Sequence, residues 1–337
     1  MFDNYLNVFI DDDYPKFIDK YVNTKTLNRI KNITQFCGCD YTKLYSPLFL
    51  YTRFDHSLVV AHMTWHFTHD KKETIAALLH DVGTPCFAHC IDYVLGDYAN
   101  QESSEEKISN VVLQDKEILQ FLKEDGINLV DLEDFQKFQI LENKSPKLCT
   151  DRLDGVLHTC YIWLHTHSLE QIKEVYNNMV ILKNEDGNLE IGFHDLKIAE
   201  KFVYMVYNYA KELQRNKDKY VMKYISEIVK LSVSYGLITL NDLYEKSERE
   251  IVNIFAKNFT SWSIFNEAST LVQSETEPSD VFYISFDTKK RNTIPLVNSF
   301  AGASRIVNVS EEAKRIYSEL ENYRDSKFAY VRSLKKL

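Results

Sequence analysis

The chain has 337 residues, and its 40 Lys and Arg against 49 Asp and Glu give a formal net charge of −9. Charged residues make up 26% of the chain and hydrophobic residues 45%, which excludes a disordered protein and is typical of a folded one with a sizeable core. The acidic balance argues against general nucleic-acid binding, because neutralising a phosphate backbone requires clustered Lys and Arg. Short apolar runs, and six cysteines without a Cys-x-x-Cys pair, predict a cytoplasmic protein that does not enter a membrane.

Apolar residues three or four positions apart predict helices along most of the chain, since few Gly or Pro interrupt them. In chain order, the predicted helices are 27–36, 56–68, 73–80, 104–122, 151–165, 195–213, 220–233 and 311–323.

Strand signals are confined to the second half of the chain. Residues 179–182 and 189–193 flank an Asp-Gly pair at 186–187, which favours a hairpin turn. Residues 281–286 and 305–309 indicate a second, small β element.

These elements predict a mainly α fold. We expect a helical core at 1–175 and a smaller α+β region with short β-hairpins at 176–337, which packs on the core or extends it.

The segment richest in chemical groups ends the predicted helix 73–80. Its apolar residues lead into His80 and Asp81, and Gly83 suits a helix C-terminus. A buried imidazole beside a buried carboxylate is costly unless both are paired or bound to a metal. Taken alone, the pair favours a helix-end hydrogen bond between the two side chains.

Two further segments carry similar groups. Arg53 and His56 lie upstream, and Asp151, Arg152 and Asp154 lie downstream. Two histidines and two carboxylates drawn from the three segments would form an N2O2 set for one divalent metal, with open positions for water and substrate. Such a metal lowers the pKa of bound water, and the two arginines would clamp a phosphate beside it.

The order and spacing of these motifs resemble the H…HD…D signature of the HD-domain phosphohydrolases, and most of all the branch of deoxynucleoside triphosphate triphosphohydrolases. The resemblance covers roughly residues 15–160. The motifs are Arg53-x-x-His56, His80-Asp81-x-Gly83 and Asp151-Arg152-x-Asp154.

The resemblance implies roles for individual residues. It implies one divalent metal ion, which the N2O2 ligands do not specify among Mn, Fe, Zn, Mg, Ni and Co. The implied metal ligands are His56, His80, Asp81 and Asp151. The implied catalytic residues are His89, Asp92 and Glu102, and the implied substrate contacts are Gln35, Arg53 and Arg152. Because the family often assembles, we also expect a homo-oligomer.

The chain departs from the family pattern at several positions, among them Thr84, which stands where the triphosphohydrolases commonly have a histidine. Gln101 stands where the family has a second catalytic histidine, and an amide is no general acid. Gly155, His158 and Thr159 stand where the triphosphohydrolases have a tyrosine and an Arg-Asp pair. All four expected metal ligands are present, whereas the expected binding of a nucleoside triphosphate is weaker than in the triphosphohydrolases.

Three functions therefore stay open. The leading hypothesis is a metal-dependent phosphohydrolase acting on a nucleotide, with a deoxynucleoside triphosphate as one candidate substrate. The first alternative is a nucleotidase or phosphodiesterase for a monophosphate, cyclic or signalling nucleotide. The second is a nucleotide-binding sensor or regulatory subunit that keeps the metal but has lost turnover.

Overall fold

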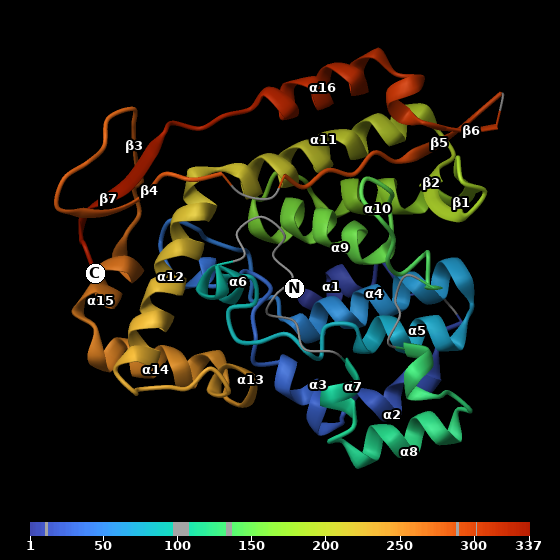
Figure 1. Cartoon of the computed structure of the whole chain (residues 1–337). Coiled ribbons are helices and arrows are strands. Elements are labelled where there is room, and N and C mark those ends of the chain that lie inside the picture. The colour runs from blue at the N-terminus through green and yellow to red at the C-terminus, as the bar shows by residue number, and fades with distance from the viewer. Residues whose placement is uncertain (11–12, 97–107, 133–136, 288–289, 301) are drawn as a thin grey trace.

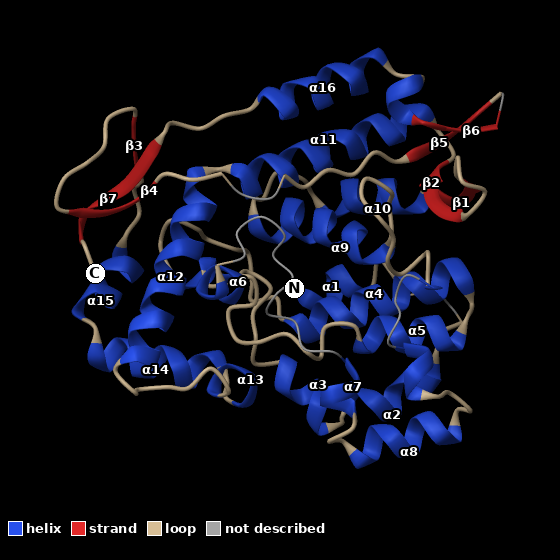
Figure 2. Ribbon diagram, viewed as in Figure 1, coloured by secondary structure: helices blue, strands red, loops and turns tan. Residues whose placement is uncertain are grey.

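The computed structural model describes residues 1–10, 13–96, 108–132, 137–287, 290–300 and 302–337. As predicted, the fold is mainly α, and its strands belong to the second half of the chain (Figure 2). The strands form two small sheets at opposite ends of the helical body, and α11 and α16 run side by side between these ends (Figure 1). Within the described ranges, no helix has the length and apolar character needed to cross a membrane.

The helices of the first half are α1 (Phe2–Leu6), α2 (Asp19–Val22), α3 (Lys25–Ile30), α4 (Arg53–Thr68), α5 (Lys71–Leu79), α6 (Cys90–Leu95), α7 (Ile108–Val112), α8 (Lys116–Glu124), α9 (Thr150–His158) and α10 (Leu169–Asn177). Those of the second half are α11 (Leu196–Gln214), α12 (Asn216–Ser234), α13 (Asp242–Glu245), α14 (Glu248–Asn258), α15 (Thr260–Glu267) and α16 (Glu311–Asn322). The strands are β1 (Met179–Lys183), β2 (Leu189–Phe193), β3 (Val272–Ser274), β4 (Val281–Ile284), β5 (Leu296–Ser299), β6 (Gly302–Arg305) and β7 (Phe328–Lys335).

A helical hairpin of α4 and α5 organises the centre of the molecule. A capping box fixes the start of α4: Thr52 accepts from the backbone N–H of Asp55, and the Asp55 carboxylate accepts from that of Thr52. The helix ends at His69, which adopts the left-handed conformation with φ 49°, and Asp70 then caps α5. Because only two residues join these antiparallel helices, the first turn of α4 lies beside the end of α5.

Three predicted helices are wrong in their extent. The helix predicted at 27–36 ends at Ile30, because the backbone of Thr34 pairs with Thr52 in an isolated antiparallel bridge. The described part of the predicted helix 104–122 contains two helices, α7 and α8, since Asp115 caps a new helix start. The predicted helix 151–165 is α-helical only to His158 and continues as a π-helical turn, η5 (Thr159–Trp163).

The first predicted hairpin is confirmed, and β1 and β2 pair in antiparallel fashion. Strand β5 pairs parallel to β2 and antiparallel to β6, which completes the sheet β1-β2-β5-β6. The second predicted β element is wrong. Segment 281–286 supplies β4, which belongs to the other sheet, β3-β7-β4, and segment 305–309 leaves its strand at Arg305 to form the 3-10 turn η6 (Ile306–Asn308).

One continuous apolar core crosses the predicted boundary between 175 and 176. It includes Val156 of α9, Phe202 of α11 and Tyr224 of α12, all fully buried. Helix α9, which carries two of the predicted site residues, therefore packs against the second half of the chain; the division into two domains stays a prediction.

Candidate metal centre

Three helices bring the predicted metal ligands together. His56 lies in the first turn of α4, His80 and Asp81 follow α5, and Asp151 lies in the first turn of α9, which packs against α4. The hairpin of α4 and α5 thus brings together residues that are 24 positions apart in the chain. The roles assigned to these residues stay predictions, and their positions are findings.

The spacing of the ligand atoms fits one metal ion. His56 Nε2 lies 3.0 Å from Asp151 Oδ1 and 3.3 Å from His80 Nε2, and the last two atoms are 3.6 Å apart. Asp81 Oδ2 lies 3.9 Å from His56 Nε2 and 3.8 Å from His80 Nε2. With metal–ligand bonds of about 2.1 Å, neighbouring ligand atoms lie about 3.0–3.5 Å apart. The first three atoms match this spacing closely, and the carboxylate of Asp81 lies just outside it.

The hydrogen bonds of the two imidazoles supply an independent test. His56 Nδ1 donates to Asp154 Oδ2 at 2.6 Å, and His80 Nδ1 donates to the backbone oxygen of Ala77 at 2.6 Å. Both Nδ1 atoms are thus engaged outside the centre, and the two Nε2 atoms face each other at 3.3 Å. Without a metal ion, a proton on His56 Nε2 occupies this point, and a metal ion would take its place. The donor set therefore fits a metal ion.

Nearby charges also favour a cation here. Burial alone would lower the pKa of His56, but hydrogen bonds to Asp151 and Asp154 outweigh it and raise that pKa to about 10. Burial would raise the pKa of Asp151, yet the two imidazoles hold it well below its ordinary value. The carboxylates thus retain their charge and attract a positive partner.

Asp154 orients this centre from behind, a role that the motif comparison did not assign. Its side chain has no exposed surface and accepts hydrogen bonds from Tyr5 at 2.6 Å, Tyr51 at 2.9 Å and His56 at 2.6 Å. His158 donates through Nδ1 to the backbone oxygen of Asp154 at 2.8 Å. Such partners fix the orientation of a ligand imidazole and raise its basicity.

Arg53 adds a buried cation to the centre. Its Nη1 donates to Asp81 Oδ2 at 2.9 Å, and only 6% of the residue is exposed. Thr84 donates to the other carboxylate oxygen of Asp81 at 3.2 Å. Burial would raise the pKa of Asp81. The charges of Arg53 and the two imidazoles outweigh this effect and hold that pKa well below its ordinary value.

Arg152 points to the loop that precedes α9. Its Nε donates to the backbone oxygen of Lys147 at 3.0 Å and its Nη1 to Glu142 at 3.0 Å, while Nη2 contacts both oxygens of Asn143. In this structure the guanidinium therefore fixes the loop that leads to Asp151. A phosphate contact by Arg152 stays a prediction.

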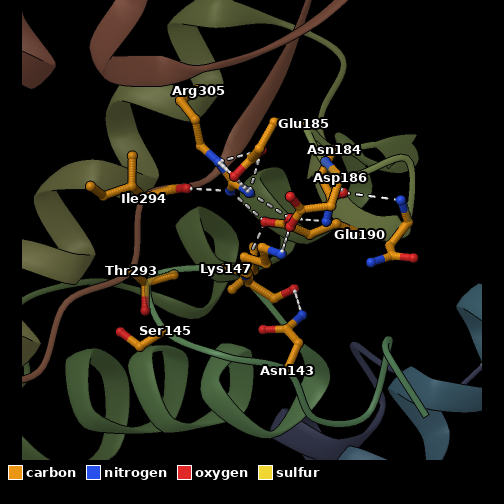
Figure 3. A network of polar contacts seen from close by, with 12 residues as sticks. Asn143, Ser145, Lys147, Asn184, Glu185, Asp186, Glu190, Thr293, Ile294 and Arg305 are labelled. Atoms are coloured by element: carbon orange, nitrogen blue, oxygen red, sulfur yellow. Dashed lines mark hydrogen bonds and ion pairs between the residues drawn. The ribbon is translucent and has the colours of Figure 1, made fainter. Parts of the chain in front are cut away.

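The C-terminal region holds the same loop from the other side (Figure 3). Glu190 of β2 accepts from the backbone N–H of Leu148 at 3.0 Å and from Arg305 at 2.5 and 2.7 Å. Lys147 pairs with Asp186 in the hairpin turn. The loop that positions Asp151 is thus anchored by residues from beyond the predicted domain boundary.

His89 and Asp92 form the predicted pair. His89 Nδ1 lies 3.0 Å from Asp92 Oδ2, and the carboxylate is fully buried at the start of α6. Burial lowers the pKa of His89 against the opposing effect of Asp92, and Arg53 and Arg291 lower it further. The residues before His89 include Phe87 at φ 62° and Ala88 at φ 43°, a strained backbone of the kind that clusters at functional sites.

Gln35 lies next to the start of α4. Its backbone N–H donates to Tyr51 at 2.9 Å, while its side-chain oxygen is buried and has no hydrogen-bond partner among the described residues. Two positions from the motif comparison, Gln101 and Glu102, lie outside the described residues.

The space above Gly155 contains a residue that sequence reasoning missed. The Tyr209 hydroxyl of α11 lies 3.9 Å from the point that a Cβ on Gly155 would occupy. Asp151, Arg152 and Arg291 are near enough to influence the pKa of Tyr209, which burial raises. The small residue at 155 was the signal in the sequence, but the tyrosine that fills the space lies in the other half of the chain.

No family model matches this chain. It is 28% identical over 240 residues to the uncharacterized protein YdhJ of Bacillus subtilis, an alignment that covers 70% of each chain. It is also 28% identical over 226 residues to the uncharacterized protein MG461 of Mycoplasma genitalium, covering 60% of this chain and 52% of that protein. The chain thus spans about half the length of the latter.

Two solved structures resemble the whole fold. A hypothetical protein from Aquifex aeolicus has a TM-score of 0.62 at 17% identity, covering 92% of this chain and 91% of that one. A phosphohydrolase from Bacteroides thetaiotaomicron has a TM-score of 0.61 at 14% identity, covering 96% and 97%. At such low identity the likeness shows a shared fold.

Proposed function

We propose that this chain is a metal-dependent phosphohydrolase of the HD type that acts on a nucleotide. The observation that carries the proposal is the convergence of His56 Nε2, His80 Nε2 and Asp151 Oδ1 within 3.0–3.6 Å, with both Nδ1 atoms engaged elsewhere. The fold shared with the Bacteroides phosphohydrolase supports the reaction class.

His56, His80, Asp81 and Asp151 would hold the ion. When bound, a divalent cation at these residues would supply Lewis acidity toward a phosphoryl oxygen and toward the attacking water. Imidazole and carboxylate ligands suit several first-row metals, so the donor set leaves the ion unspecified.

Two residues beside the centre would act on the phosphate ester. Arg53, already oriented by Asp81, would stabilise negative charge on the phosphate oxygens as a preorganised donor in a buried site. His89, oriented by Asp92 through Nδ1, would use Nε2 to protonate the leaving oxygen. Because burial lowers the pKa of the free ring, the second proton that this step requires would be taken up when the anionic phosphate binds beside it.

Gln35 supports the choice of a nucleotide. Its buried side-chain oxygen would accept a hydrogen bond from a hydroxyl of the sugar, which would satisfy an acceptor that has no partner among the described residues. We include a deoxynucleoside triphosphate among the candidate substrates on the resemblance of the motifs.

A smaller phosphate ester is the second candidate. The observation that favours it is the position of Arg152, whose donors are taken by Glu142, Asn143 and Lys147. With Arg152 fixed to this loop, fewer cationic side chains are available to bind the three phosphates of a nucleoside triphosphate. A monophosphate or a cyclic nucleotide requires fewer cationic contacts.

Metal content followed by a nucleotide panel tests the proposal. The purified chain is expected to retain about one divalent ion per chain and, with Mn²⁺ added, to release a phosphate product. Release of tripolyphosphate from a deoxynucleoside triphosphate would support triphosphohydrolase activity. Release of orthophosphate from a monophosphate would support the second candidate function. His80→Ala should lose both metal and activity.

The exposed His69 supplies the control, because it lies between the same two helices and 58% of its side chain is accessible. His69→Ala should keep both metal and activity. A metal-loaded chain that releases no product from any nucleotide would overturn the hydrolase and leave the sensor.

A further inference from the structure

A cavity of about 260 Å³ lies between the start of α12, the segment after β4 and the segment before β7. None of the predicted site residues that the structure describes lines it. Its polar lining points to a charged ligand. The lining residues are Gln214, Asn216, Lys219, Ser285, Phe286, Asp287, Lys290, Tyr323, Arg324, Asp325, Ser326 and Lys327.

The lining carries more positive than negative charge. Four cationic residues face two aspartates, and three of the cations, Lys290, Arg324 and Lys327, are exposed. Lys290 and Arg324 both donate to the backbone oxygen of Glu321, at 3.1 and 2.9 Å. A backbone carbonyl does not neutralise a cation, so the positive charge of both side chains can still attract an anion.

The two aspartates do not offset this charge. Asp325 is engaged at the start of α12, where its Oδ2 accepts from the backbone N–H of Asn216 at 2.7 Å. The side chain of Asp287 is 94% exposed and lies at the 4.0 Å limit from Lys219. Water screens an ion pair of that kind.

Lys219 is the buried cation of the cavity. Only 6% of the residue is exposed, and its Nζ donates to the backbone oxygen of Phe286 at 3.2 Å. Burial lowers its pKa, because the lost hydration of the ammonium outweighs the opposing effect of Asp287, Asp325 and Asp218. An anion in the cavity would add negative charge close to the ammonium.

We propose that this cavity binds a small phosphate-bearing anion, with Lys219 at its base and Lys290, Arg324 and Lys327 around its mouth. Clustered ammonium groups and a guanidinium recognise phosphate oxygens through charge-assisted hydrogen bonds. The cavity is too small and too polar for an extended apolar ligand, since the only rings in its lining are those of Phe286 and Tyr323.

The site borders the candidate active site without sharing its ligands. Phe286 packs edge-on against Tyr93 with ring centroids 5.7 Å apart, and Tyr93 follows Asp92 in α6. An anion bound in the cavity is therefore separated from the His89–Asp92 pair by ring contacts, and it is distinct from the substrate of the proposed hydrolase.

Titration calorimetry with pyrophosphate, without divalent metal, tests this site. The Asp151→Asn chain lacks one of the two carboxylate ligands of the proposed metal centre, so with no divalent ion present metal-bridged binding there is removed. We expect one pyrophosphate per chain. Arg324→Gln with Lys327→Gln, added to that background, should weaken binding by at least about tenfold, because two charge-assisted contacts are lost.

A matched pair on α16 provides the control. Lys314 and Arg315 are about half exposed and pair with glutamates of their own helix, so Lys314→Gln with Arg315→Gln changes the net charge equally at a distance from the cavity. This control should bind like its parent. Both double variants change exposed side chains only, which keeps the test independent of folding.

Two results would overturn the site: no heat of binding in the Asp151→Asn chain, or equal loss in the two double variants. Lys219→Met gives a second measurement, and it should abolish binding in a chain whose thermal unfolding shows that it is folded. Because no readout depends on turnover, failure of the proposed hydrolase would leave this result unaffected.

Discussion

Asp154 and Glu190 are both fully buried carboxylates, yet their surroundings balance charge in opposite ways. Glu190 receives two N–H groups of Arg305 at 2.5 and 2.7 Å, so a permanent cation balances it inside the protein. Asp154 receives two tyrosine hydroxyls and the Nδ1 of His56. Its charge is therefore offset by an imidazole that can lose its second proton, and not by a permanent cation.

The difference separates an ion pair that holds the fold, the scaffold pair of Arg305 and Glu190, from residues that could hold a ligand. Arg305 bridges Glu190 and Glu185, and Glu190 joins this group to the loop before α9. Asp154 holds His56 with its Nε2 at the point where His80 and Asp151 converge. In the proposed metal centre, a cation at that point would complete the charge balance of the Asp154 side.

Removing a ligand should have the largest effect. Asp151→Asn is expected to reduce bound metal from about one ion per chain to a trace and to abolish hydrolysis, because an amide is a poorer ligand than a carboxylate. Elemental analysis and a product assay measure both. Glu190→Gln should leave the metal in place, and if it lost metal to the same extent, the proposed separation would be wrong.

Breaking the scaffold pair should cost stability instead. Arg305→Met leaves Glu190 buried without its cation, and we expect the free energy of unfolding to fall by about 3–5 kcal/mol. Denaturant unfolding measures this loss. Adding Glu190→Gln removes the stranded charge while keeping an acceptor for Leu148, so the double variant should recover part of the stability. A loss in the double variant that equals or exceeds that of Arg305→Met would contradict the argument.

Substituting a hydrogen-bond partner of Asp154 should have an intermediate effect, seen mainly in the affinity for metal. Tyr51→Phe removes one donor at 2.9 Å from Asp154, and we expect metal affinity to fall about 10–100-fold while the chain stays folded. Competition with a fluorescent chelator gives the affinity. Tyr220→Phe is a fair control, since its hydroxyl is buried without a hydrogen-bond partner among the described side chains and backbone.

Glu248 is a third buried carboxylate, and its substitution should have the smallest effect, a change in how stability depends on pH. It is 1% exposed and accepts from the backbone N–H of Phe87 at 2.9 Å. Burial, with the nearby Asp40, raises its pKa from 4.5 to about 8. The folded chain therefore holds a proton that the unfolded chain releases, and the stability from this proton is complete below pH 4.5 and lost as pH approaches about 8.

Glu248→Gln should flatten this dependence. The amide keeps an acceptor for Phe87 and cannot ionise, so the melting temperature of the variant should gain on that of the parent between pH 5 and pH 8. Melting curves across that range measure the difference. Glu311→Gln, at a side chain that is 89% exposed, should run parallel to the parent. A constant offset for Glu248→Gln would show that Glu248 titrates normally.

Local pattern made most of the helices predictable, and it singled out residues that the fold brings together. Helical spacing located α4 and α5, and the order of His56, His80 and Asp151 led to a cluster that the structure brings within 3.0–3.6 Å. The role of Asp154 was not predicted, because its partner Tyr5 lies 149 residues away and no local signal links the two.

The same limit applies to the strands. The partner of β4 is β7, and this pairing depends on packing across the end of the helical body. The helix predicted at 27–36 failed because Thr34 gains a backbone partner in Thr52, which sequence periodicity does not show. Pairings between distant segments are set by the whole fold.

The hydrogen bond from Tyr5 to Asp154 also constrains how the protein is made. A ribosome that has passed α5 and the two residues after it has produced both imidazoles and Asp81, but Asp151 and Asp154 are not yet part of the chain. Translation must reach α9 before the carboxylates can close the centre and before Tyr5 has its acceptor. An ion in the proposed metal centre could therefore reach all four predicted ligands only after the ribosome has passed the start of α9, and nascent chains that stop before α9 cannot present Asp151 to it.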